Sequence, residues 1–237
     1  MFFIANHPIY NHPLPEGHRF PMLKYELLPK QLLHEGTAEC TDFYSPDSID
    51  LSLVHAVHTV SYVKALTELT LDAKAVRSIG FPLSAALVER ELRIAQGTVV
   101  GCNHALENGI AFNIAGGTHH AFSDRGEAFC LLNDQAIAAQ YLINQKKCHK
   151  ILIVDLDVHQ GNGTAEIFQN NADVITFSMH GQSNYPFRKE TSDYDIALPD
   201  KTDDTTYLSI LQETLPELLN IHRPDFVFYL AGVDILG

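Results

Sequence analysis

The segment 151–163, with the sequence ILIVDLDVHQGNG, contains the most informative pattern in this chain. The apolar β-formers at 151–154 lead directly into Asp155, Asp157 and His159, and the chain then turns through two glycines. Since side chains alternate between the faces of an extended strand, these three ionisable groups should project to the same side where the strand ends. Two carboxylates and an imidazole crowded together need a positive charge among them. The segment therefore predicts a metal ion.

Asp157 and His159 are the best candidates for the metal ligands. Mixed oxygen and nitrogen donors suit Zn²⁺ in a catalytic site, where three protein ligands leave one position for water. Fe²⁺ and Mn²⁺ accept the same ligand types. An N-capping aspartate with a hydrogen-bonded histidine is the alternative interpretation of this pair, and Asp155 on the same face argues for the metal.

The composition bounds the fold and the partners. With 237 residues, 46% of them hydrophobic, the chain can bury a substantial core, and we expect a single α/β domain over residues 1–237. The net charge of −13 argues against direct nucleic-acid binding, which needs a basic face. The acidic balance would steer lysine-rich or polyamine substrates toward the protein, although a solvated acidic surface is the commoner explanation of such a charge.

The sequence shows no pattern typical of a disulfide-bonded, membrane-spanning or secreted protein. The four cysteines have no CxxC spacing and are expected to be reduced thiols. No apolar run approaches the ~18–20 residues of a membrane span, and the N-terminal stretch has no basic region before its short apolar run. We therefore expect a cytoplasmic protein, or a nuclear one in a eukaryote.

Short apolar strands alternate with helices along the second half of the chain, which predicts a parallel sheet buried on both faces. The expected strands are 2–5, 110–115, 151–155, 174–178 and 226–230, and the expected helices are 22–34, 60–71, 84–108, 131–144, 164–169 and 203–219. In such sheets ligands bind beyond the carboxyl ends of the strands. The unusual residues fall there, which indicates one active site.

Two further clusters follow predicted strands. The sequence GGTHHA at 116–121 has two glycines that let the backbone come close to a site, followed by a histidine pair that could provide a proton acceptor and an electrostatic helper. Ser178, in the sequence SMH, could hold a monovalent cation together with Asp155. A structural role for the histidine pair, and a strand-end serine that bonds only to backbone, are the alternatives.

These pieces together resemble the zinc-dependent histone deacetylases, which share a fold with arginase, and most closely the class IV and bacterial members. The motifs that carry the resemblance are YNHP at 10–13, HRFPM at 18–22, GGTHHA at 116–121, AFCLLND at 128–134, DLDVHQGNG at 155–163, SMH at 178–180 and AGVD at 231–234. The resemblance implies a three-layer α/β sandwich around a mostly parallel sheet.

The same resemblance implies roles for the polar residues. Asp157 and His159 would bind zinc, and His119 and His120 would be the tandem catalytic histidines, with His120 as the general base. Asp155 would orient His119. Asn162 would stand where class I enzymes have an aspartate facing the second histidine. A structural potassium ion would be bound by Asp155, Asp157, His159, Ser178 and Met179.

The substrate side of the site is also implied by the resemblance. Phe129 and Tyr185 match the aromatic walls of the acyl-lysine tunnel, Arg19 matches an arginine of the acetate-release channel, and Gly117 matches a substrate-binding position. Ala128 replaces a glycine that is common before the tunnel phenylalanine, which should narrow the pocket.

The C-terminal end departs from the family pattern. We expect the third zinc ligand a few residues beyond the position of Asp234, within AGxDxLxxD, and the tyrosine that polarises the acyl carbonyl farther downstream. Since the chain ends at Gly237, both would be missing, the domain would be truncated at its C-terminus, and Asp234 would have a structural role.

Three functions compete. The first is a zinc-dependent hydrolase that removes acetyl or longer acyl groups from lysine side chains. The second is an acetylpolyamine or other small-molecule amidohydrolase on the same scaffold. The third is an inactive binding protein, which the missing ligand and tyrosine would allow. The oligomeric state is left open.

Overall fold

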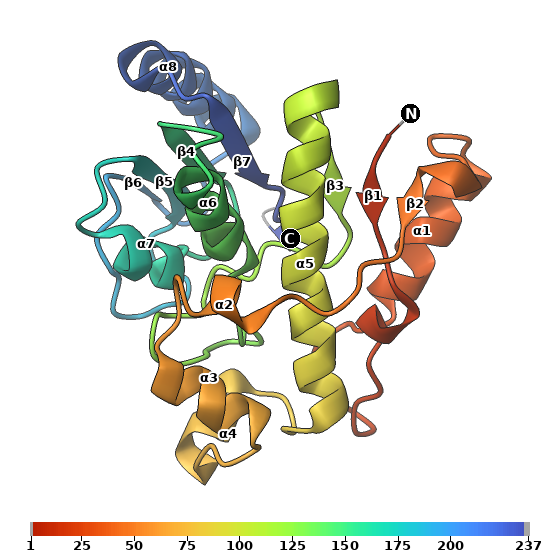
Figure 1. The fold of residues 1–237 in the computed structure, drawn as a ribbon. Helices are drawn as coiled ribbons and strands as arrows, with labels where there is room; N and C mark the ends of the chain where they lie inside the picture. The colour runs from red at the N-terminus through yellow and green to blue at the C-terminus, as the bar shows by residue number, and fades with distance from the viewer. Residues whose placement is uncertain (1, 235–237) are drawn as a thin grey trace. The chain divides into compact units, whose positions relative to one another are not determined.

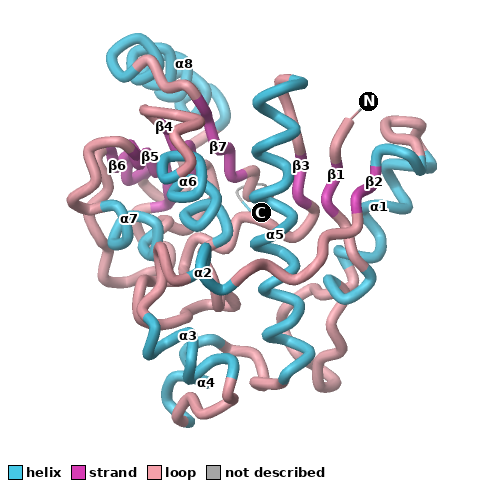
Figure 2. The backbone as a smooth tube through the Cα atoms, in the orientation of Figure 1, coloured by secondary structure: helices cyan, strands magenta, loops and turns pink. Residues whose placement is uncertain are grey.

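A computed structural model describes residues 2–234 of this chain and divides it into two compact units, residues up to Tyr141 and residues from Leu142 onward (Figures 1 and 2). Every strand pair in the described residues is parallel. Helices accompany these sheets, which confirms the α/β class predicted from the alternating pattern. The expectation of a single domain stays a prediction, and each unit is described by itself.

The first unit contains a three-stranded sheet in the order β2-β1-β3, formed by Phe43–Tyr44, Ile4–Ala5 and Phe112–Asn113. The long helix α5 (Ala85–Asn108) packs along β1 and β3, as Figure 1 shows. Gly97 of α5 makes this close approach possible, because a Cβ atom there would lie 2.8 Å from the Cβ of Ala5.

The other helices of the first unit have clear start and stop signals. Thr59, Asp72 and Ser84 accept hydrogen bonds from the first turns of α3, α4 and α5, and Gly80 and Gly109 end α4 and α5 in the left-handed conformation. The bounds of the helices that complete this unit are α1 Lys24–His34, α2 Leu51–Val54, α3 Val60–Thr67 and α4 Ala73–Ile79. Helix α6 (Asp134–Asn144) runs across the boundary between the units.

The second unit contains a four-stranded parallel sheet in the order β6-β5-β4-β7. The strands are β4 Ile151–Asp155, β5 Val174–Gly181, β6 Tyr194–Leu198 and β7 Phe226–Leu230, and the helices are α7 Asn162–Phe168 and α8 Asp204–His222. All five residues of β4 are buried, as expected for a central parallel strand. Leucines of α8 pack against a core that includes Leu152, Phe177 and Met179.

The structure corrects several predicted bounds. The strand expected at 110–115 is only Phe112–Asn113, and the helix expected at 131–144 begins at Asp134. The helix expected at 60–71 ends at Thr67, and Leu69 has a left-handed φ of 59°. The elements that were not predicted are β2, α2, α4, β6 and the short 3-10 helices Pro8–Tyr10 and Cys40–Asp42.

Candidate functional site

Three polar side chains of the second unit form a cluster that could hold a metal ion. The Nδ1 atom of His159 lies 2.9 Å from Oδ1 of Asp157 and 3.1 Å from Oδ2 of Asp234. One ligand atom from each residue lies within 4.8 Å of the others. Two carboxylates and one imidazole are a donor set that suits a catalytic zinc with three protein ligands, so the residues present fit the ion.

The turn after β4 is built by its own aspartates. Oδ1 of Asp155 accepts the backbone N–H of Asp157 at 3.1 Å, and Oδ1 of Asp157 accepts the backbone N–H of His159 at 2.8 Å. Oδ1 of Asp234 accepts the N–H of Val158 at 3.3 Å. Each carboxylate therefore fixes one backbone N–H group of the turn 157–159.

The structure places the carboxylate of Asp234 beside Asp157 and His159, where it could bind the same ion. The position expected for the third zinc ligand lies outside the described residues, and the structural role expected for Asp234 stays a prediction. The residue follows β7, which pairs with β4 along its whole length, so the ends of both strands bring Asp234 to Asp157 and His159. Gly232 allows this approach, since a Cβ atom there would lie 2.6 Å from Cα of Asp157.

The predicted potassium residues come from neighbouring strands. Asp155 of β4 and Ser178 of β5 stand opposite each other in the sheet, and both are buried. Oγ of Ser178 lies 3.0 Å from Nδ1 of His180, and the side chain of Met179 is in the core, so Met179 could contribute only its carbonyl. Burial lowers the pKa of His180.

Tyr185 lies beside the metal cluster. Its ring centroid is 6.4 Å from that of His159, and the two rings meet edge to face. The tyrosine is partly buried in the segment between β5 and β6. Asn162, predicted as a partner of the second histidine, is the buried first residue of α7.

The tandem histidines belong to the first unit. The rings of His119 and His120 have centroids 4.0 Å apart, and both side chains are about 5% exposed. The loop that carries them turns at Gly117, whose φ is +88° and whose carbonyl accepts the N–H of His119 at 3.0 Å. This is the region that favours glycine.

Asp134 fixes the start of the histidine loop, a role that the sequence did not reveal. Its Oδ1 accepts the N–H groups of Gly117 and Thr118, both at 2.9 Å, and the Thr118 hydroxyl at 2.7 Å. Its Oδ2 accepts the hydroxyl of Thr98. A Cβ atom on Gly116 would lie 2.7 Å from the same Oδ2, so a residue without a side chain is needed there.

Asn133 and His58 fix the end of the same loop. Asn133 donates its side-chain amide to the carbonyl of Ala121, and its backbone N–H donates to Nε2 of His58. The other ring nitrogen of His58 therefore carries the proton and donates to the carbonyl of Phe122 at 2.8 Å. Burial lowers the pKa of His58 to about 4.

Phe129 lies in an aromatic cluster of the first unit. Its ring contacts Phe20 and Phe81, with centroids 5.0 and 5.1 Å apart, and the guanidinium of the exposed Arg19 lies over its face at 4.9 Å. Ala128 and Phe129 both have left-handed φ angles, 43° and 70°. Their N–H groups donate to the carbonyls of Ser78 and Ile79 at the end of α4, which holds this strained tip.

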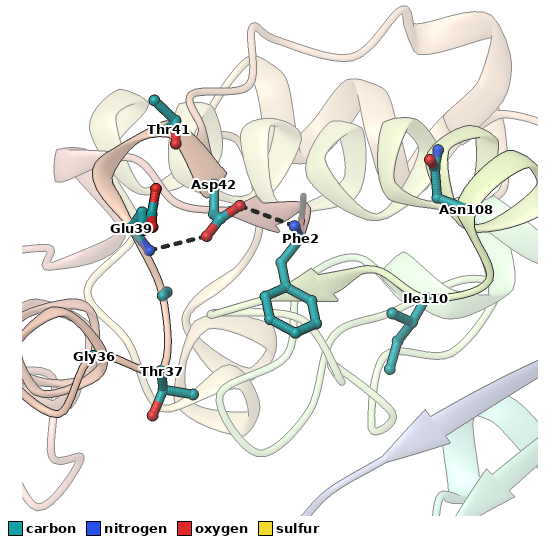
Figure 3. Close-up of a pocket in the computed structure, with 9 residues that line it drawn as sticks. Phe2, Gly36, Thr37, Glu39, Thr41, Asp42, Asn108 and Ile110 are labelled. Carbon is teal, nitrogen blue, oxygen red and sulfur yellow. Dashed lines mark hydrogen bonds between the residues drawn. The ribbon is translucent and has the colours of Figure 1, made fainter.

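An open cavity of about 580 Å³ in the first unit is lined by none of the predicted site residues (Figure 3). Both carboxylate oxygens of Asp42 on its wall already accept hydrogen bonds, from the N–H groups of Phe2 and Glu39, each at 2.9 Å. These two bonds fix the orientation of the Asp42 carboxylate on the cavity wall.

Two expectations from composition agree with the described residues. The four cysteines, all within the described residues, form no disulfide. Among residues 2–234, no helix has the length and apolar character needed to cross a membrane.

The profile described as "Histone deacetylase domain" matches residues 18–237. An uncharacterized protein of Picosynechococcus sp. is 48% identical over 233 residues, which cover 98% of this chain and 78% of that protein. Histone deacetylase 2 of Arabidopsis thaliana is 28% identical over 92% of this chain and 59% of its own length. The acetoin utilization protein AcuC of Bacillus subtilis is 29% identical over 78% of this chain and 52% of its own length.

Solved structures with the same fold include a histone deacetylase homolog from Aquifex aeolicus, with a TM-score of 0.82 and 23% identity over 96% of this chain and 67% of that one. The deacetylase domain of HDA15 has a TM-score of 0.81 and 21% identity, over 98% of this chain and 72% of that one. The chain thus spans between about half and four fifths of the length of these proteins.

Proposed function

Because this chain belongs to the histone deacetylase family, we propose that it is a metal-dependent hydrolase that removes acyl groups from amines, with acetyl-lysine side chains as the first substrate class. The observation that supports this most directly is the cluster of Asp157, His159 and Asp234 where β4 and β7 end. Zinc is the proposed ion and potassium the proposed structural ion, each by the family resemblance and the donor types.

Asp157, His159 and Asp234 would hold the ion, and His119 and His120 would act on the substrate and the attacking water. When bound, a zinc ion would act as a Lewis acid on the acyl carbonyl and lower the pKa of a water molecule. His120 would take a proton from the attacking water and pass it to the leaving amine, as positioned imidazoles do in general acid–base catalysis. His119, oriented by Asp155, would supply electrostatic support.

Orientation of the histidine pair by the first unit supports this assignment. The loop 117–122 is bonded on one side by Asp134 and on the other by Asn133 and His58, all buried. A loop fixed in this way loses little entropy when a substrate binds. Asn162, unlike an aspartate, carries no charge to raise the basicity of a histidine, so we expect a weaker base than in class I enzymes.

Substrate binding would use aromatic side chains and the backbone. Tyr185 and Phe129 are proposed to contact the acyl-lysine stem, Gly117 to contact the substrate through its backbone, and Arg19 to assist release of the acid product. The net charge of −13 favours cationic substrates, which include both lysine-rich proteins and acetylated polyamines.

Hydrolysis of an acetyl-lysine peptide and of an N-acetylated polyamine by the full chain tests the proposal. Treatment with a chelator should abolish turnover, and stoichiometric zinc should restore it. His120→Ala should reduce kcat by about 100-fold or more, while His55→Ala, at an exposed histidine of the first unit, should leave it unchanged.

The competing functions give different results in the same assay. Turnover of the polyamine alone would replace the lysine deacylase assignment with that of a small-molecule amidohydrolase. Tight zinc binding without hydrolysis of either substrate would favour the inactive binding protein. Full turnover by His120→Ala would remove the proposed base.

A further inference from the structure

The segment between β5 and β6 contains a partly buried positive charge that none of the motifs includes. The Nζ atom of Lys189 donates to the backbone carbonyls of Pro186 at 2.6 Å, Asn184 at 2.7 Å and Gln182 at 3.3 Å. An ammonium group has three donors and no acceptor. The three carbonyls therefore match its full donor capacity, and we call this set the carbonyl nest.

The carbonyl nest surrounds Tyr185 in the sequence. Asn184 and Pro186, which provide the two shorter bonds, are the residues directly before and after this tyrosine. The Tyr185 ring in turn lies beside His159 of the metal cluster. The Lys189 ammonium thus fixes the backbone on both sides of the aromatic residue next to the cluster.

The same segment is attached to the metal-binding turn at both ends. At its start, the N–H of Gly181 donates to the carbonyl of Val158 at 2.9 Å. At its end, the buried Gln160 donates to the carbonyl of Glu190 at 2.8 Å and accepts its N–H at 2.9 Å. Between these attachments, Gln182 and Asn184 are exposed to solvent, so the Lys189 ammonium bonds the middle of the segment.

We propose that Lys189 is a positioning residue: a tethered cation in the carbonyl nest that holds Tyr185 beside the metal cluster. Backbone carbonyls bind small monovalent cations in the same manner. Resting on the proposed function, this makes Lys189 a determinant of the acyl-lysine binding wall. Its role is to maintain the position of Tyr185, and it does not touch the reacting atoms.

Cleavage by chymotrypsin tests the positioning role without any need for activity. Phe187 is 93% exposed and lies within the segment, whereas a bond before proline, such as that after Tyr185, resists the protease. Cleavage of a locally opened segment follows the population of the open form. Loss of three bonds to a charged donor in Lys189→Met should raise the rate of cleavage after Phe187 on the order of tenfold.

Chemical rescue separates a cation effect from a general loss of packing. In Lys189→Ala, ammonium chloride should slow the cleavage back toward the wild-type rate, whereas choline chloride, whose cation is too large for the carbonyl nest, should not. The wild-type protein in each salt corrects for effects on the protease. Lys64→Ala, at an exposed lysine with a side-chain exposure of 68%, is the matched control and should be cleaved as the wild type is.

The proposal is overturned if folded Lys189→Met, verified by circular dichroism, is cleaved at the wild-type rate. It is equally overturned if ammonium protects Lys189→Ala no better than choline does.

Kinetics with an acetyl-lysine peptide provide the second readout. Lys189→Met should raise KM about five- to tenfold with a smaller change in kcat, and it should add nothing in a Tyr185→Ala background, because the two residues act through one contact. Fully additive effects would overturn the positioning role. Absence of turnover in the wild type would refute the proposed function, while the cleavage experiment would still decide the role of Lys189.

Discussion

Replacing Gly232 with alanine should separate the two carboxylates of the metal cluster. An added Cβ atom would lie 2.6 Å from Cα and 2.7 Å from Cβ of Asp157, whereas carbon contacts become ordinary near 3.4 Å. The backbones after β4 and β7 would have to move apart by about 0.8 Å, the difference between 3.4 and 2.6 Å. Metal sites tolerate only about 0.2 Å of ligand displacement.

The expected result is a fall in zinc affinity of about 10- to 100-fold, the range that loss of ligand support produces in metal sites. Overpacking should also lower the free energy of unfolding by about 1–3 kcal/mol. Titration of zinc against a chromogenic chelator measures the affinity, and urea denaturation of the metal-free protein measures the stability.

Gly101→Ala is the matched control. Gly101 lies inside α5, where an added Cβ atom would be 3.4 Å from its nearest neighbours. Alanine is favoured over glycine in a helix by about 0.5–1 kcal/mol, so this variant should bind zinc normally and be equally or more stable. A folded Gly232→Ala variant with wild-type zinc affinity would refute the assignment of Asp157 and Asp234 to one metal site.

Three further predictions concern the first unit. The pKa of His58 is about 4 in the folded protein, against an ordinary 6.5. As the pH falls, this imidazole is therefore protonated in the unfolded chain before it is protonated in the folded protein. The free energy of unfolding should fall by about 3 kcal/mol between pH 6.5 and pH 4. In His58→Asn, the free energy of unfolding measured with urea should fall less over this pH range, by about that amount. If it fell equally in the wild type and the variant, the low pKa of His58 would be contradicted. Ala128→Gly should raise the free energy of unfolding by about 1 kcal/mol, because glycine removes the strain of the left-handed φ; a destabilised variant would contradict it. Asp134→Asn should lower that free energy by about 2–3 kcal/mol, since an amide donor would face groups that also donate. The exposed Asp47→Asn is its control, and equal stability of the two variants would contradict the role of Asp134.

Two strands of the second unit, β4 and β7, could be predicted closely because their local signals are strong. The bounds of β4 and β7 agree with the prediction, since both are runs of β-formers next to charged residues. Strand β6 was missed: its residues alternate between partly buried and exposed positions, and it is only five residues long. Strand β2 has only two residues, which is too short for any periodic pattern.

The residue types of the site were predictable, but their partners were not. Asp157 and His159 stand two positions apart in the turn that follows β4, so their proximity is local in sequence. Asp234 lies 75 positions beyond His159 and joins them only because β7 pairs with β4. The contacts of Asp134 with Gly117 and Thr118 are likewise long-range in sequence, and no local pattern indicates them. His119 and His120 as catalysts, and Asn162, Arg19 and Gly117 in their family roles, remain predictions.

The pairing of two carboxylates with one imidazole has an electrical consequence. A divalent ion held by Asp157 and Asp234 would cancel their two negative charges, with His159 neutral. Capture of the ion would then be accelerated by the field of the empty site and slowed by added salt, whereas its release would start from a formally uncharged complex and respond little to ionic strength. Long-range electrostatic attraction would thus set the rate of ion binding, and the bonds to the three ligands would set the rate of ion release.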